Sequence, residues 1–337
     1  MKSRDVTFYS RGVKLAGKVN VPDDYVEGTK LPCIIPCSGY TGIGAAYPTL
    51  LSRLFTKYGY ATVTFDYRGW LPSEGDLSCT TTEDEYFDIE AAYIFATLQP
   101  EIQKENIGLF GWGFSAPIVL KLTADYPEIK AVGCGNGIYN GEKAISTILT
   151  WPDFIKLKEI MRKDLEQRVL TGKGAQLPPY QPCGNARAYA YRLDHVEPLT
   201  LDWMVNTAQV AYNKDSADLK GSFMDVEGVP EAIEKNWGGR ENFPPRLGFE
   251  VGESHLRIDA SYDVKRINGS RPIFIVHAIG DDTYPVSGAR DIAREIGPTC
   301  TSCFVAGDHN EFMFDDHPEF ARFSSEIIKF YDKALKA

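Results

Sequence analysis

The chain has 337 residues, of which 43% are hydrophobic, 12% aromatic and 24% charged. This composition is typical of a globular protein and excludes a disordered, collagen-like or coiled-coil chain, while the length predicts two domains or one enlarged domain. The 36 Lys and Arg residues against 46 Asp and Glu give a formal net charge of −10. Such a charge argues against a protein that binds nucleic-acid backbones.

The chain start and the cysteines indicate a protein of the cytoplasm. Residues 1–9 read as a strand without the apolar core of a signal peptide, and no unbroken apolar run is long enough to span a membrane. Seven cysteines in no disulfide-like framework favour a reducing compartment. Cys300 and Cys303 lack a second pair with which to complete a zinc site, so we expect neither a metal nor a cofactor.

Strand-like and helix-like segments alternate over the first 140 residues. Helices are predicted around residues 50–55, 82–98 and 114–126, and strands at 13–21, 31–37, 60–67, 106–112 and 130–135. The spacing from Thr82 to Glu85 is that of a capping box and opens the second helix. This alternation predicts a mostly parallel sheet with helices on both faces.

The alternation stops at about residue 139 and resumes near residue 265. Helix-like patches and turn-rich pieces fill the stretch between, and the chain then continues with strands at 272–277 and 301–306 and helices at 287–296 and 317–335. Asp316 and Glu319 have capping-box spacing at the start of the last helix. We therefore predict a core of residues 1–138 and 265–337, with residues 139–264 inserted as a cap.

Three motifs carry the chemistry. The strand-to-helix junction Asn106–Ala116 resembles the nucleophile elbow of the α/β-hydrolase superfamily, in particular its dienelactone-hydrolase, acetyl-xylan-esterase and prolyl-oligopeptidase-like branches. Phe274–Pro285 resembles that family's acid-bearing strand end and Ala306–Phe312 its histidine loop, which matches the acid to Asp281 and the base to His309. The resemblance covers nearly the whole chain outside the insertion. It implies an α/β-hydrolase fold with a large, mainly helical cap.

The residue types suit this chemistry independently of the resemblance. A serine hydroxyl is a poor nucleophile until a neutral imidazole takes its proton, and a carboxylate orients that imidazole and stabilises its cation. Asp281 and His309 follow successive predicted strands, so they can come within hydrogen-bond reach, and the spacing to Pro285 favours Asp281 over Asp282 as the acid. The other histidines considered are expected to be packing or surface residues: His195, His255 and His277.

Glycine occupies the position of the nucleophile. In an alignment on Gly111 and Trp112 this position is Gly113, which tolerates a strained backbone but has no side chain to attack a substrate. Three interpretations stay open: a deliberate replacement of Ser or Cys by Gly, a natural loss of the nucleophile, or Ser115 as an alternative nucleophile. The first is favoured because an abandoned triad has no reason to keep both its acid and its base.

The resemblance also implies an oxyanion hole. Its donors are matched to the N–H groups of Tyr40, in a loop where the family has His-Gly-x, and of Phe114, which follows the elbow. Asp66 and Arg68 lie in a loop that resembles a structural family loop, and we expect them to brace each other. Four tryptophans are candidates for lining the substrate pocket: Trp112, Trp151, Trp203 and Trp237.

The sequence thus predicts a serine-type or cysteine-type hydrolase in which glycine at position 113 removes the nucleophile. Its substrate is expected to be a mid-sized, partly apolar small molecule with an ester, lactone, thioester or activated C–C bond. Other hypotheses stay open: an acyltransferase on the same triad, a non-catalytic ligand-binding pseudo-hydrolase, or a lyase or cyclase that uses the His309–Asp281 pair. No nucleic-acid or membrane partner is expected, and a homodimer is left open.

Overall fold

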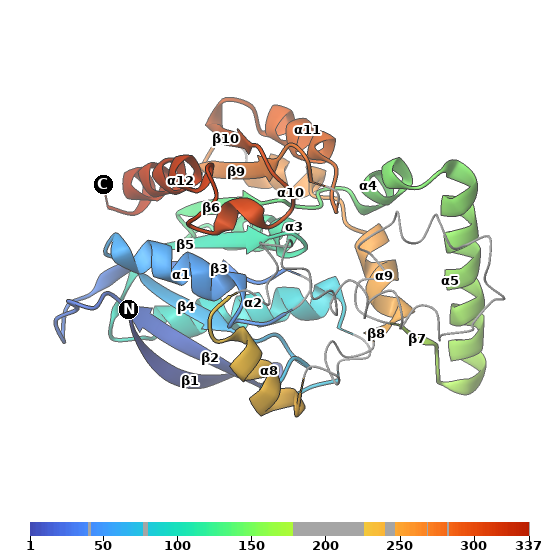
Figure 1. Ribbon diagram of the computed structural model, residues 1–337, viewed down its shortest axis with the longest axis horizontal. Coiled ribbons are helices and arrows are strands. Elements are labelled where there is room, and N and C mark those ends of the chain that lie inside the picture. Colours follow the sequence, from blue (N-terminus) through green and yellow to red (C-terminus); the bar gives the residue numbers. More distant parts are fainter. Residues whose placement is uncertain are drawn as a thin grey trace.

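A central sheet of eight strands organises the protein (Figure 1). The computed structural model describes residues 1–39, 42–76, 80–177, 226–239, 247–267, 269–281 and 283–336. In spatial order the strands are β1 (Lys2–Ser10), β2 (Val13–Val21), β4 (Ala61–Phe65), β3 (Leu31–Cys37), β5 (Ile102–Trp112), β6 (Ala131–Gly135), β9 (Ile273–Ala278) and β10 (Cys300–Val305). The pairs β1–β2 and β2–β4 are antiparallel, and all neighbours from β4 to β10 are parallel.

Helices cover both faces of this sheet. Gly108 and Gly111 are three residues apart in β5 and therefore face opposite sides. A Cβ at Gly108 would lie against Tyr331, whereas a Cβ at Gly111 would lie against Val119, and the ring of Tyr331 also packs edge-on against Phe55. One face therefore carries α1 (Tyr47–Lys57) and α12 (Phe320–Leu335), and the other carries α3 (Ser115–Asp125). Helix α3 contacts α2 (Thr82–Thr97) and α10 (Ser261–Ile267), and α11 (Val286–Ile296) lies beside α10. The predicted fold class is confirmed.

The starts of two helices differ from their predicted caps. The N-cap of α2 is Thr81, whose hydroxyl accepts the Asp84 N–H while the Asp84 carboxylate accepts the Thr81 N–H. The box predicted from Thr82 to Glu85 is therefore wrong by one residue. Helix α12 begins only at Phe320, after an N-cap residue, Glu319, that makes no side-chain cap, so the predicted box from Asp316 is wrong as well.

The described part of the predicted cap has a small hydrophobic cluster of its own. This part of the predicted cap contains α4 (Gly141–Ile148), α5 (Trp151–Thr171), the strand pair β7 (Gln176–Leu177) and β8 (Leu247–Gly248), α8 (Val229–Trp237) and α9 (Phe249–Leu256). The cluster joins α4, α5 and α9 through Ile145, Leu149, Phe154, Leu157, Met161 and Phe249. By contrast, α8 packs on the main core, and α10, which crosses the predicted boundary at residue 264, packs against α3 and α11.

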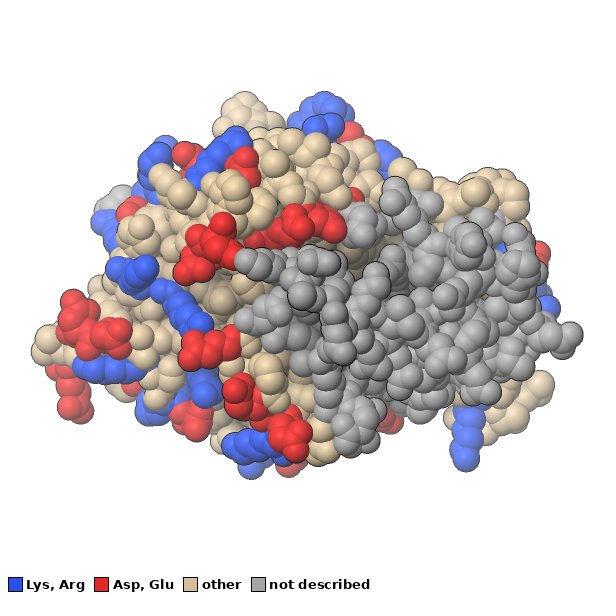
Figure 2. Space-filling model, in the orientation of Figure 1, with Lys and Arg blue, Asp and Glu red and all other residues tan. Residues whose placement is uncertain are grey.

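The distribution of charge on the surface and the apolar character of the helices are two further features of the described residues. On the face in Figure 2, acidic and basic side chains are interspersed over the described surface. No helix among the described residues combines the length and the apolar composition that a membrane span requires.

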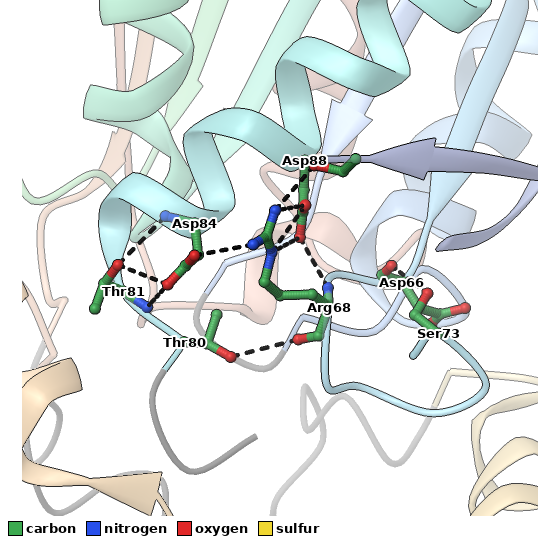
Figure 3. Close-up of polar contacts among 8 residues, drawn as sticks. Asp66, Arg68, Ser73, Thr80, Thr81, Asp84 and Asp88 are labelled. Atoms are coloured by element: carbon green, nitrogen blue, oxygen red, sulfur yellow. Dashed lines mark hydrogen bonds and ion pairs between the residues drawn. The ribbon is translucent and has the colours of Figure 1, made fainter. Parts of the chain in front are cut away.

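A buried ion pair fastens the loop after β4 to helix α2 (Figure 3). Arg68 lies 2.9 Å from Asp84 and 2.7 Å from Asp88, and its backbone N–H donates to Asp88 at 2.8 Å. The side chain of Asp88 is fully buried. Asp66 instead accepts the N–H of Gly44 at 2.9 Å, so the predicted brace between Asp66 and Arg68 is wrong. The two carboxylates of α2 reach Arg68 together because residues four apart share one face of a helix.

Helix α9 contacts the start of α3 through stacked rings. The centroids of His255 and Phe114 are 3.5 Å apart and the ring planes differ by 19°. His255 is fully buried, and its Nδ1 lies 2.7 Å from the carbonyl oxygen of Val251. Burial lowers the pKa of His255 to about 3, although the hydrogen bond to Val251 opposes the shift. His255 is thus a packing residue, as predicted, and it joins the insertion to the core.

Replacing Asp88 by Ala is expected to lower the free energy of unfolding by about 3 kcal/mol, because it removes the buried carboxylate that pairs with Arg68. Urea unfolding would measure this loss. Glu166→Ala is the matched control, because it breaks an i,i+4 pair with Arg162 that is exposed to solvent, and its effect should be much smaller. Equal losses in the two variants would contradict the structural role of the Arg68 network.

The buried His255 should make folding sensitive to acid. Its pKa is lowered in the folded protein, so below pH 6.5 the unfolded chain binds a proton that the folded chain does not, and stability falls until about pH 3. Between pH 7 and pH 5 the His255→Phe variant should therefore lose about 2 kcal/mol less of its free energy of unfolding than the wild type. Equal pH dependence in wild type and His255→Phe would refute the assignment.

Candidate active site

The site is built from strand ends that meet at one edge of the sheet. Strands β3, β5, β6, β9 and β10 are neighbours in this order and run parallel, so their carboxyl ends lie together. In α/β sheets this edge is where ligands bind. The residues that follow these strands include Gly39, Gly113, Asn136, Asp281 and His309.

Gly113 forms the sharp turn between β5 and α3. Its φ of +55° lies in the left-handed region, which glycine adopts at no steric cost. The N–H of Gly113 donates to the carbonyl oxygen of Gly135 at 2.7 Å. A Cβ built at position 113 would lie 3.5 Å from His309 Nε2 and 3.8 Å from a ring carbon of Tyr284. A side chain at this position would therefore project toward the residue predicted as the base.

His309 and Asp281 form a hydrogen-bonded pair. The distance from His309 Nδ1 to Asp281 Oδ2 is 2.8 Å, and Asp281 Oδ1 accepts the N–H groups of Thr283 and Tyr284, each at 2.8 Å. The Asp281 side chain is fully buried, which would raise its pKa, but His309 and His277 outweigh burial and hold that pKa below the ordinary value. The carboxylate therefore stays ionised and orients His309 with Nε2 as its basic nitrogen.

His277 is a second histidine on the same carboxylate, and sequence reasoning gave it only a packing role. Its Nε2 lies 3.3 Å from Asp281 Oδ2 and 2.9 Å from the carbonyl oxygen of Tyr284. Both oxygens can only accept, so Nε2 is the protonated nitrogen. The ring is fully buried, and its Nδ1 has no hydrogen-bond partner among the described residues. The spacing of four residues before Asp281 was the one sequence signal for this contact.

Asn136 is a further residue that the sequence analysis did not identify. It is fully buried with a φ of +42°. Its side-chain N–H donates to the carbonyl oxygen of His309, and its side-chain oxygen accepts the N–H of Ala278 at 2.7 Å. Asn136 thus ties the ends of β6 and β9 to the histidine loop. A sequence signal existed, because Asn136 stands between Gly135 and Gly137 directly after a strand and Asn tolerates positive φ.

Ser115 is turned away from the base. Its side chain is fully buried, its hydroxyl oxygen accepts the N–H of Trp112 at 2.9 Å, and it lies 3.1 Å from the carbonyl oxygen of Cys37. These contacts hold the hydroxyl against the ends of β3 and β5. The geometry therefore does not favour Ser115 as a nucleophile.

Of the two predicted oxyanion donors, Phe114 lies among the described residues and Tyr40 does not. Phe114 is the N-cap of α3, so its N–H lies at the positive end of the helix dipole. Tyr40 lies outside the described residues, as do Asp282, His195 and Trp203. The preceding Gly39 is close to the elbow, because a Cβ there would lie 3.1 Å from the carbonyl oxygen of Trp112.

Of the candidate pocket tryptophans, Trp112 lies next to the base. Its ring meets His309 edge-on at 6.0 Å between centroids, and its indole N–H donates to the side chain of Asn310 at 3.2 Å. Trp237 packs edge-on against Trp70, and Trp151 is 66% exposed on α5.

Two hollows lie near these elements. A pocket of about 350 Å³ between α4 and α11 is lined in part by Ile138 and Tyr284, and the Ile138 N–H donates to the carbonyl oxygen of Gly113 at 3.3 Å. A larger cleft of about 1080 Å³ runs between α1 and α12 and contains none of the predicted site residues. In the part of the chain that is described, no cluster of His, Cys, Asp and Glu could hold a metal ion.

Comparisons with known proteins support this architecture. A model of the X-Pro dipeptidyl-peptidase family (S15) matches residues 11–148. An uncharacterised 31.7 kDa protein of Escherichia coli, from the traX-finO intergenic region, is 27% identical over 164 residues, which is 49% of this chain and 56% of that protein. The match therefore spans little more than half of that curated relative.

Solved structures are similar over nearly the whole chain. The α/β hydrolase GrgF of a Penicillium species has a TM-score of 0.70 at 17% identity, with all of both chains covered. Est1E of Butyrivibrio proteoclasticus, solved with ferulic acid bound, has a TM-score of 0.58 at 16% identity, with 98% of this chain and all of that chain covered. These structural likenesses concern the fold, and the family model matches residues 11–148 only. The chain therefore has the fold of the α/β hydrolases.

Proposed function

We propose that this is the site of an acyl-bond hydrolase of the nucleophile–Asp–His type, in a form that lacks its nucleophile. The observation that carries the proposal is the distance of 3.5 Å between a Cβ at position 113 and His309 Nε2. A hydroxyl or thiol on that Cβ would come within hydrogen-bond reach of the base. Gly113 supplies neither group.

With Ser or Cys at position 113, the reaction follows from the geometry. His309 takes the proton of the nucleophile, which attacks the acyl carbonyl, and the ionised Asp281 stabilises the imidazolium. The N–H groups of Phe114 and Tyr40 are the proposed donors to the oxyanion. His309 then delivers its proton to the leaving group. With an alcohol or amine as acceptor in place of water, the same steps give acyl transfer.

An ester of a mid-sized, partly apolar acid is the proposed substrate. The pocket beside Tyr284 has room for such a group at about 350 Å³, and the similar protein Est1E was solved with ferulic acid, an aromatic acid. A lactone, a thioester or an activated C–C bond presents the same carbonyl chemistry. The reaction needs neither a metal nor a cofactor.

We place the protein in the cytoplasm as part of this proposal. Its support is that five cysteines of the described chain are free thiols: Cys33, Cys37, Cys134, Cys300 and Cys303. Free thiols are typical of a reducing compartment.

The Gly113→Ser variant should hydrolyse p-nitrophenyl acetate or butyrate and be labelled by a fluorophosphonate probe, because it restores the nucleophile beside His309. In that variant, Asp281→Asn should lower kcat by about 10⁴, since the imidazole loses the partner that fixes its tautomer. Steady-state kinetics and intact-mass spectrometry would measure both effects.

Gly113→Ala is the matched control, because Ala imposes the same backbone strain as Ser without a hydroxyl, and it should remain unlabelled. If Gly113→Ser and Gly113→Cys both folded but stayed inert to esters and probe, while the wild type bound a ferulate-like ligand, a non-catalytic binding function would replace the proposed one.

A further inference from the structure

We propose that the protein with Gly113 hydrolyses acyl bonds without a covalent intermediate, by using His309 to activate a water molecule in the volume that a nucleophilic side chain would fill. This inference rests on the proposed function, since it uses the same base and oxyanion donor. It assigns to the glycine form an activity of its own.

The backbone at the elbow leaves room for that water. Around an ideal Cβ at Gly113, and apart from residues 112–114, the nearest atoms of the described residues are His309 Nε2 at 3.5 Å, a ring carbon of Tyr284 at 3.8 Å and His309 Cε1 at 3.9 Å. A free water molecule cannot occupy the Cβ position itself, which is one covalent bond from the Gly113 Cα, but these distances leave it room farther from the Cα, beside His309 Nε2. A water there can donate to Nε2, which is the nitrogen that Asp281 does not engage.

The base is oriented by contacts that are independent of residue 113. Nδ1 of His309 is held by Asp281 at 2.8 Å, and the backbone of His309 is held by Asn136. The ring lies between Trp112 and Tyr284, edge-on to each, at 6.0 and 5.5 Å between centroids. Loss of the nucleophile therefore leaves a correctly oriented general base in place.

The proposed step is a direct hydrolysis. His309 Nε2 takes one proton from water, the water oxygen forms a bond to the acyl carbon, and the carbonyl π pair moves onto its oxygen, next to the Phe114 N–H. The tetrahedral intermediate then collapses, the bond to the leaving oxygen breaks, and the imidazolium proton passes to that oxygen. One ester and one water give one acid and one alcohol, with no oxidant, reductant or cofactor.

The test compares the initial rates of p-nitrophenyl acetate hydrolysis by the wild type and three single variants: Gly113→Ser, Gly113→Ala and His309→Ala. The wild type should be about 10²-fold faster than His309→Ala, in the range of general-base catalysis. Gly113→Ala should fall to the His309→Ala rate, because its methyl group narrows the space beside His309 Nε2 in which the water must lie, while leaving His309 and Asp281 in place. Circular dichroism and the urea midpoint of each variant would verify that it is folded.

Intact-mass spectrometry during turnover separates the water route from a covalent one. The wild type should stay at its unmodified mass, whereas Gly113→Ser should accumulate an acyl adduct. If Gly113→Ser turns over and the wild type is no faster than His309→Ala, the water route is wrong and the proposed function stands. If the wild type carries an acyl adduct, or Gly113→Ala retains the wild-type rate, the water route is also wrong. If Gly113→Ser is inert, the proposed function fails and this inference fails with it.

Discussion

The backbone turn at Gly113 is the constraint on which the rest of the site depends. The chain passes from β5 into α3 with a φ of +55° at a single residue, and its neighbours fit closely around it. A Cβ at Gly111 would lie 2.7 Å from the carbonyl oxygen of Ser115, and the Ser115 hydroxyl accepts the N–H of Trp112. These contacts use no side chain at position 113. The elbow therefore keeps its shape whether that position carries a nucleophile or a hydrogen atom.

Asp281 has a structural role besides the proposed catalytic one. A buried carboxylate is costly unless its oxygens are hydrogen-bonded, and Asp281 is contacted by two backbone N–H groups and by the rings of His277 and His309. Removing it would take the acceptor from Nδ1 of His309 and leave the buried Nε2 of His277 only the carbonyl oxygen of Tyr284. The sequence argument that an intact Asp–His pair favours a deliberate loss of the nucleophile is weakened by this, because packing alone is a reason to keep both residues.

Local signals predicted the strands and the strand-to-helix turn at Gly113 well, but the pair of Asp281 and His309 was the one contact between distant segments of the site that they predicted. The strands at 13–21 and 31–37 have the bounds expected from their turn residues. The first capping box was displaced because Thr80, Thr81 and Thr82 are adjacent and each suits an N-cap. Asn136 was missed as a site residue because its role depends on which strands are neighbours: it follows β6, whereas its partner Ala278 ends β9 and its partner His309 follows β10. The spacing of residues in a single sequence does not contain the order of the strands in the sheet.

The predicted insertion and the proposed catalytic machinery meet at one residue, Phe114. Phe114 supplies a proposed oxyanion donor through its backbone N–H, and its ring is the surface on which His255 of α9 stacks. A movement of α9 would therefore act on the residue proposed to hold the oxyanion. Because burial lowers the pKa of His255 to about 3, the ring stays neutral in mildly acidic solution and the stack persists there. The segment that should select the substrate is thus coupled mechanically to the group that should stabilise its transition state.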